Sequence, residues 1–258
     1  MPKNKQNRRG QRRRRRKRIN KKNRICDKNR FIQKQPSFII RVMTSFLTLY
    51  EITQFMTCNK KIHKICRYDY ILSKPWTYTQ YVKLSQLEQT YVRDIRYDLK
   101  TPIYKNMLLT KLTHITFGQK FNQPIDAKSL PTGLTHLVFG RDFNQPIYQD
   151  TLPYELQYIR FGEMFNHIIR QNVLPTTLTY IHFGTYFNQY IHSDVLPDGL
   201  KRIIFECYYN QPLHINVLPS TLTHLIFGYA FNQPLHLNSL PKGLTTLQFG
   251  YKFNQYLN

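Results

Sequence analysis

The stretch LPTGLTHLVFGRDFNQPI, residues 130–147, decides the fold because most of it returns at a constant interval. Shifted by 22 residues, the chain matches itself from near residue 108 almost to its end. One asparagine column keeps this interval without a slip: Asn122, Asn144, Asn166, Asn188, Asn210, Asn232 and Asn254. Repetition at a fixed period in the twenties is typical of a solenoid, whose units stack on one another.

Two aromatic columns keep the same interval. The residue before each asparagine is Phe, or Tyr at position 209, and another Phe stands four residues earlier in every copy. These pairs are Phe117/Phe121, Phe139/Phe143, Phe161/Phe165, Phe183/Phe187, Phe205/Tyr209, Phe227/Phe231 and Phe249/Phe253. One copy cannot bury its own rings, so we expect neighbouring coils to enclose them in a shared core.

The unit itself predicts one short strand and an extended return. Leu137 and Phe139 are two residues apart and therefore share one face of a strand. We expect Gly140 to turn the chain with a positive φ, and Asn144 to satisfy backbone groups in a ladder with its copies. Pro146 excludes a regular helix from the return path. Seven such coils would form a parallel sheet about 30 Å long, because neighbouring strands lie about 4.8 Å apart.

The unit LPxxLTxLxFGxxFNQPI resembles the FNIP repeat over residues 108–258. That repeat is similar to the leucine-rich repeat, and the resemblance implies a protein-interaction scaffold. FNIP repeats behind an F-box are an arrangement found chiefly in social amoebae and in large DNA viruses that infect amoebae.

Residues 36–68 predict two or three short amphipathic helices. Apolar residues between Ile39 and Leu47 recur at helical spacing, and Thr48 followed by Glu51 is the sequence of a capping box. The run PSFIIRVMTSFLTLYEITQFMTCNKKIHKI, residues 36–65, resembles an F-box. It departs from that family at Phe38, where an acid is usual.

The F-box resemblance implies docking onto the Skp-type adaptor of a cullin-RING ubiquitin ligase. The alternative is a helical cap for the domain that follows. The residues that the resemblance assigns to adaptor contact are Pro36, Ile39, Ile40, Met43, Phe46, Leu47, Ile52 and Phe55.

Residues 1–34 form a basic tail with seventeen Lys and Arg and a single acid, Asp27, so it carries +16 of the formal net charge of +24. Charges this dense repel one another, and we expect the tail to be disordered. Three roles stay open: a nuclear or nucleolar address, an electrostatic contact with RNA or DNA, and a solubilising arm. No aromatic residue precedes Phe31, so base stacking is not supported.

Residues 85–105 allow two interpretations. Val92, Ile95 and Tyr97 resemble a degraded coil shortened by two residues, which would shield the first Phe layer. Ser85 with Glu88 could instead cap a helix.

The patterns together predict an α+β chain, with a small helical F-box-like segment followed by a leucine-rich-repeat-like β-solenoid of 22-residue coils. Its regions are the tail at 1–34, the F-box-like helical domain at 35–75, a linker and degenerate capping coil at 76–107, and a solenoid of about seven coils at 108–258.

Two columns of the strand should face outward, and they vary where the buried columns are nearly constant. The first is His114, His136, Tyr158, Tyr180, Arg202, His224 and Thr246; the second is Thr116, Val138, Arg160, His182, Ile204, Ile226 and Gln248. Drift at unconstrained positions would explain the variety, but explains less well why Lys and Glu are absent from both columns. We therefore predict that a client protein binds at His136, Tyr158, Arg160, Tyr180, His182, Arg202 and His224.

A metal site and an enzyme are both disfavoured. His192, His214 and His236 align in three consecutive coils, but the other copies break the column, so we predict no metal. The chain has no G-x-S-x-G sequence, P-loop or Gly-rich dinucleotide turn, and its acids scatter over different coil positions. We predict no catalysis and no cofactor.

The chain has no apolar run of 18 residues and no apolar stretch behind its basic start, so we expect neither a membrane span nor a secretory signal. The cysteines Cys26, Cys58, Cys66 and Cys207 have no framework spacing, which favours free thiols in a reducing compartment. We expect an intracellular protein of cytoplasm or nucleus, in the host cell if it is viral.

Three functions are compatible with these patterns, in order of preference. The first is a non-catalytic substrate receptor of a ubiquitin ligase, with the F-box on the adaptor and the solenoid on a client. The second is a repeat scaffold whose basic arm binds nucleic acid. The third is a solenoid with no partner beyond itself.

Overall fold

The computed structural model describes residues 75–236 and 239–256, and Pro75–Asn258 forms one compact unit. The basic tail and the F-box-like segment, with all the residues predicted to contact the adaptor, lie outside the described residues. The described part of the chain consists of the solenoid and the short segment that opens it.

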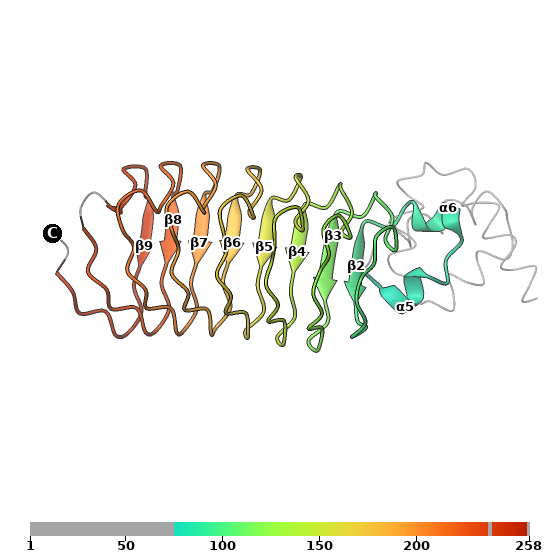
Figure 1. Cartoon of the computed structure of the whole chain (residues 1–258), viewed down its shortest axis with the longest axis horizontal. Coiled ribbons are helices and arrows are strands. Elements are labelled where there is room, and N and C mark those ends of the chain that lie inside the picture. Colours follow the sequence, from blue (N-terminus) through green and yellow to red (C-terminus); the bar gives the residue numbers. More distant parts are fainter. Residues whose placement is uncertain (1–74, 237–238, 257–258) are drawn as a thin grey trace, which may run out of the picture. The chain divides into compact units, whose positions relative to one another are not determined.

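The solenoid contains a nine-stranded sheet in which every strand pairs in parallel with the next along the chain (Figure 1). The strands are β1 (Trp76–Thr77), β2 (Asp94–Tyr97), β3 (His114–Phe117), β4 (His136–Val138), β5 (Tyr158–Arg160), β6 (Tyr180–His182), β7 (Arg202–Ile204), β8 (His224–Ile226) and β9 (Thr246–Gln248). Each return path between β3 and β9 lacks an α-helix in the described residues, as the recurring prolines predict.

The pairing register confirms the 22-residue coil. From β3 onward each residue pairs with the one 22 positions later, as Leu137 does with Ile159. Strand β2 pairs with β3 at an interval of 20, with Ile95 opposite Ile115. The coil that begins at β2 is therefore the shortened one, and the sheet extends further toward the N-terminus than seven coils would.

Two short helices precede this shortened coil, α5 (Tyr78–Tyr81) and α6 (Gln86–Gln89). Ser85 caps α6 in a complete capping box, in which its backbone N–H donates to Glu88 Oε2 at 2.9 Å. Both interpretations of residues 85–105 thus hold, the helix first and the coil after it. Tyr78 of α5 packs on Tyr97 with ring centroids 4.9 Å apart, so the first aromatic layer is covered.

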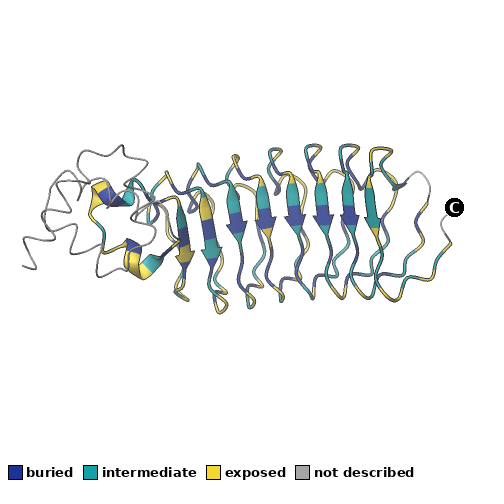
Figure 2. Cartoon of the chain, turned by 180° about the vertical axis from the view of Figure 1, so that it is seen from behind, coloured by how far each residue is buried: buried dark blue, intermediate teal, exposed yellow. Residues whose placement is uncertain are grey.

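The core contains two adjacent columns of stacked aromatic rings. Within one coil Phe139 and Phe143 stack at 3.9 Å, and between coils Phe139 and Phe161 stack at 5.8 Å with an interplanar angle of 6°. The middle residue of each strand from β4 to β8 is also buried (Figure 2). Burying a Phe contributes roughly 1.5–3 kcal/mol, so the predicted core columns supply most of the driving force.

The predicted asparagine ladder is present. The backbone N–H of Asn144 donates to Asn122 Oδ1 at 2.9 Å, and the same bond recurs in each later coil up to Asn254, which donates to Asn232. In most coils the following Gln also donates to that oxygen, as Gln145 Nε2 does to Asn122 Oδ1 at 3.1 Å. Each such amide oxygen therefore joins two donors of the next coil.

The prediction that Gly140 has a positive φ was wrong, and the structure gives a different reason for glycine at this position. No glycine in the described residues has a positive φ. A Cβ at Gly140 would instead lie 2.0 Å from the backbone oxygen of Gly118, so glycine is needed because adjacent coils approach closely. Positive φ falls on a different column, which includes Asp150, Asn172 and Asp194, residue types that tolerate this conformation.

Candidate functional site

The two variable columns lie on the outward face of the sheet, as predicted. Strand pairing puts His136, Tyr158, Tyr180, Arg202 and His224 in one row, and Arg160 beside His182 in the other. The seven residues predicted to bind a client therefore share one continuous surface. Their involvement in binding stays a prediction.

Four rings of the first row stack on one another. Centroid distances are 4.1 Å for His114–His136, 5.4 Å for His136–Tyr158 and 4.4 Å for Tyr158–Tyr180, with interplanar angles of 12°, 21° and 13°. Both ring faces of His136 and of Tyr158 are thus occupied by neighbouring rings. What this row can offer a partner is ring edges, which carry hydroxyl groups and imidazole nitrogens.

Threonine hydroxyls hold the histidines of this row. Thr135 Oγ1 lies 2.9 Å from His136 Nδ1, and the same contact joins Thr113 to His114. Thr135 Oγ1 also donates to the backbone oxygen of Thr113 in the coil before, at 3.1 Å. His114 and His136 are therefore held through threonines, and Thr135 is itself bonded to the backbone of the coil before.

Two arginines stand on either side of Tyr180. Burial, followed by the adjacent Tyr158, raises the pKa of Tyr180, whereas Arg202 and then Arg160 lower it. Both guanidinium groups are consequently close enough to act on the same phenol. This centre of the sheet face combines aromatic and cationic groups, which are common in the energetic core of protein interfaces.

His182 is paired with an acid that sequence reasoning overlooked. His182 Nε2 lies 2.7 Å from Glu206 Oε1. Burial lowers the pKa of His182, while the hydrogen bond to Glu206 raises it and Arg160 lowers it. Glu206 stands where the other copies have glycine, so a break in a constant column was the available signal.

Asp94 was also missed, because the first outward row was counted from β3 onward. It pairs with His114 and so occupies the position before that histidine in the row. Burial raises the pKa of Asp94, and His114 and His136 lower it. The row therefore begins with an acid and continues with two histidines.

Exposed tyrosines border the C-terminal coils just past the strands. Tyr186 stacks on Tyr208 at 5.1 Å, and Tyr229 on Tyr251 at 5.5 Å. Lys252 Nζ lies 5.5 Å from the centroid of Tyr229. Each of these four phenols is at least 45% exposed, and no constant column marked them in advance.

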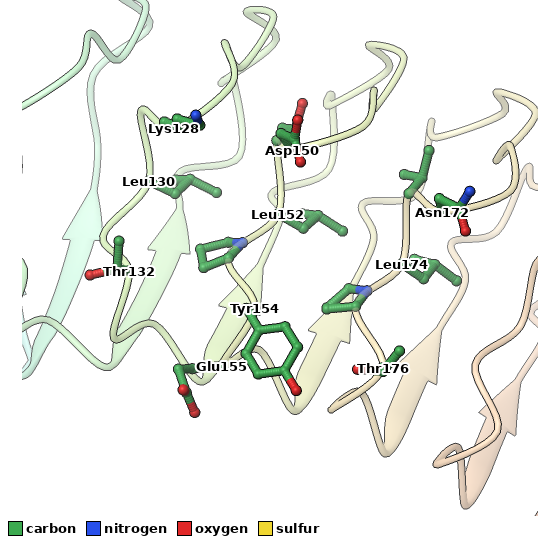
Figure 3. A pocket seen from close by; sticks show the side chains of 14 residues that line it. Lys128, Leu130, Thr132, Asp150, Leu152, Tyr154, Glu155, Asn172, Leu174 and Thr176 are labelled. Atoms are coloured by element: carbon green, nitrogen blue, oxygen red, sulfur yellow. The ribbon is translucent and has the colours of Figure 1, made fainter.

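The return paths form shallow grooves between successive coils. One groove of about 540 Å³ runs past Leu130, Leu152 and Leu174, which occupy equivalent positions, with Tyr154 and Glu155 at its edge (Figure 3). Its lining repeats with the coil and brings no set of polar groups to one point. It lacks the convergent polar groups typical of a small-molecule site.

On the return path, Tyr190 packs against two members of the histidine column. The ring of Tyr190 contacts His192 at 4.6 Å and His214 at 5.7 Å between centroids. Among residues 75–236 and 239–256, no group of three His, Cys, Asp or Glu side chains is placed to hold a metal ion.

Over the same ranges, no helix is long and apolar enough to cross a membrane. Cys207 is exposed and forms no disulfide.

Comparison with known proteins supports this architecture. The chain is similar to the solved structure of CroV588, described as a novel circular LRR protein and coming from a giant virus. The two are 45% identical with a TM-score of 0.63, over 64% of this chain and 24% of that one. The chain thus spans about a quarter of that protein's length. No curated protein matches it significantly.

The family model of the FNIP repeat matches residues 121–164, 143–186, 165–208, 187–230 and 231–258. These segments together span residues 121–258, more than half of the chain. The solenoid is of the leucine-rich-repeat kind, an architecture typical of non-enzymatic scaffolds for protein interaction. The chain belongs to the FNIP repeat family.

Proposed function

We propose that this protein is a non-catalytic substrate receptor of a Skp–cullin–F-box type ubiquitin ligase. Its solenoid binds a client on the outward sheet face, and residues 36–55 bind the Skp-type adaptor. The observation that carries the client half is the pre-ordered row of stacked rings with Arg160 and Arg202 beside it. The adaptor half is supported by the F-box resemblance of residues 36–65.

The mechanism is proximity. A client held on the solenoid keeps its lysines near the ubiquitin-loaded conjugating enzyme, which raises their effective concentration. The receptor needs no catalytic group of its own for this. It needs a rigid surface, which the interlocked coils provide.

The client half is tested by replacing Tyr158, Arg160, Tyr180 and His182 together with alanine. Proteins that co-purify with the full chain in its cell of origin are identified by mass spectrometry. We expect a defined set of proteins to be lost from the variant. Unchanged recovery of every co-purifying protein would contradict the assignment of this face.

The chain offers a matched control on its return paths. Tyr148, Tyr154, Arg170 and His192 are exposed and have the same four side-chain types. Their replacement with alanine should leave the co-purifying set intact. Circular dichroism and thermal melting of both variants establish that the solenoid still folds.

The adaptor half is tested by co-expression with a Skp-type adaptor. The full chain should retain the adaptor, and Ile39→Asp with Phe46→Asp should lose it while the client set stays bound. Failure of the full chain to retain the adaptor would leave a scaffold that acts outside this ligase class.

A second candidate function is favoured by the charge of the tail. Residues 1–34 carry +16, enough for salt-sensitive and sequence-independent contact with RNA or DNA. Retention on heparin or RNA that disappears when residues 1–34 are removed would support this function. Equal retention of both proteins would exclude the tail as the site.

A further inference from the structure

We propose that the outward face binds an acidic protein segment in extended conformation, with two of its carboxylates paired to Arg160 and Arg202. This inference rests on the proposed function of the sheet face and specifies the chemistry of its partner. Three observations carry it: the charge of the face, the spacing of its arginines and the stacking of its rings.

Beyond β2, which carries Asp94 and Arg96, the charge of this face has one sign. From β3 to β9 the two outward rows contain two arginines and no acid. Glu206, the acid that borders them, is bonded to His182. The acids Asp150, Asp194 and Asp198 lie on the return side, where they line the grooves. A partner with carboxylates is therefore complementary to the sheet face, whereas the grooves of the return side mix these acids with Lys128 and Lys242.

The spacing of the two arginines fits an extended segment. Arg160 and Arg202 are two strands apart across the sheet and two residues apart along it. Ordinary strand spacings then separate their Cα atoms by about 12 Å. In an extended chain, residues i and i+4 point to the same side and lie about 13 Å apart. A helix matches this distance only with residues seven or eight apart, about 11–12 Å. Its backbone amides and carbonyls are already bonded within the helix, so a helix cannot use the polar ring edges between the arginines.

The groups between the arginines fit a peptide. Tyr158, Tyr180 and His182 present polar ring edges, which can exchange hydrogen bonds with backbone amides and carbonyls. Tyr180 is half-buried and stacked, so its hydroxyl is held in place. The segment would thus receive two charge-assisted contacts at its ends and polar contacts between them.

The same rings argue against single-stranded nucleic acid. Bases bind such proteins by stacking on free aromatic faces. In this row each inner ring has a neighbouring ring on both sides, as His136 has His114 and Tyr158. Between Arg160 and Arg202, the inner rings of this row therefore offer nucleic acid no free face on which a base could stack.

The experiment selects ligands from a random 12-residue peptide library displayed on phage, with the full chain as bait. Recovered peptides are resynthesised with fluorescein and titrated by fluorescence polarisation. The variants are Arg160→Gln with Arg202→Gln, the alanine quadruple variant of the face, and Arg170→Gln as the matched control. Because the basic tail is present in every protein, its contribution cancels between variants.

We expect enrichment of acid pairs four residues apart. Their binding should weaken on the order of tenfold for each arginine removed and should persist in the Arg170→Gln control. Arg160→Glu with Arg202→Glu should instead bind peptides in which the two acids are changed to lysine. That charge swap shows that a loss of binding is not a loss of folding.

Two outcomes would overturn the inference. In the first, acidic peptides bind all variants equally, which would place the contact on the tail. In the second, the affinity for a poly(U) oligonucleotide depends on Arg160 and Arg202 more than the affinity for peptides does, which would make the ligand nucleic acid. Peptides without acids that bind the wild type but not the quadruple variant would refute the acidic partner and leave the proposed function standing. If no peptide depends on the face at all, the acidic partner is refuted by this selection, while the co-purification experiment judges the client surface independently.

Discussion

The inward and outward positions of the same strand differ in how much their residue type varies between coils. Phe161 faces inward, and its place is filled by Phe in every copy, whereas Tyr158 faces outward and its column holds His, Tyr, Arg and Thr. Inside, each ring must fit the ring of the coil on either side, so one shape propagates along the stack. Outside, a side chain must only avoid its neighbours, and the surface is free to take the chemistry of a partner.

The largest effect should come from breaking the inner column. Phe161→Ala leaves a cavity between Phe139 and Phe183, and we expect the free energy of unfolding to fall by about 3–5 kcal/mol. Tyr158→Ala, three residues away on the other face, should cost clearly less. Urea denaturation followed by circular dichroism measures both, and equal losses would erase the distinction between the columns.

A smaller effect is expected where coils approach through glycine. A Cβ at Gly162 would lie 1.8 Å from the backbone oxygen of Gly140, so Gly162→Ala must push two coils apart. We expect a loss of about 1–3 kcal/mol, the usual range for overpacking. At Gly243 the nearest atom to such a Cβ is 3.7 Å away, which makes Gly243→Ala the control. A control as unstable as Gly162→Ala would contradict the steric explanation.

The asparagine ladder should contribute a comparable amount per rung. Asn188 Oδ1 accepts from the backbone N–H of Asn210 at 2.9 Å and from Gln211 Nε2 at 3.1 Å. Asn188→Ala leaves the part-buried amide of Asn210 without its acceptor, for a loss of about 1–3 kcal/mol. Gln171→Ala, exposed on a return path, should be close to neutral in the same urea titration. If Asn188→Ala and Gln171→Ala have the same urea midpoint, water replaces the hydrogen bonds that the ladder loses.

The smallest effect is a pH dependence of the outward row. Burial, and then the adjacent His114, lowers the pKa of His136, although Asp94 raises it. A histidine whose pKa is lowered by folding binds fewer protons in the folded chain than in the unfolded one. Its stabilising contribution is therefore present above about pH 6.5 and is lost as the pH falls through the lowered pKa.

This dependence is measured as the thermal midpoint between pH 7.5 and pH 5.5. The midpoint of the wild type should fall with the pH, and His136→Gln should fall less. His136 stacks between His114 and Tyr158, and Asp94 lies beyond His114 in the same row. A His136→Gln midpoint that falls as far as the wild type would assign the pH dependence to other groups.

Much of the fold could be predicted from the interval alone. Stacking puts residue i beside residue i+22, so the Phe core, the ladder through Asn144 and both outward rows can be derived without knowledge of any side-chain contact. The shortened coil at β2 was one of two interpretations of residues 85–105, and it rested on the apolar alternation of Ile95 and Tyr97. The 22-residue period determines which residues lie side by side in successive coils, and the core, the ladder and both outward rows are all built in this way.

The features that could not be predicted depend on backbone angles and on single exceptions. Gly140 suggested a left-handed turn, but close coil packing explains its column equally well, and residue type alone does not separate the two. The left-handed positions at Asp150 and Asn172 have the residue types expected there, yet Lys128 in the same column obscures the pattern. The pair of His182 with Glu206 exists in one coil only, and the break in the glycine column marks Glu206 without showing which side chain it binds.

The ladder also determines how the length of this protein can change. Every rung joins one coil to the next by the same bonds, as Asn166 joins to Asn144 and Asn188 to Asn166. Removing or duplicating 22 residues anywhere in the middle re-forms each bond with an equivalent donor and acceptor. Gene duplication by whole coils can therefore lengthen the recognition surface by about 4.8 Å at a time. A change of any other length must be absorbed within a single coil, as in the shortened coil at β2, if the asparagines are to keep their partners.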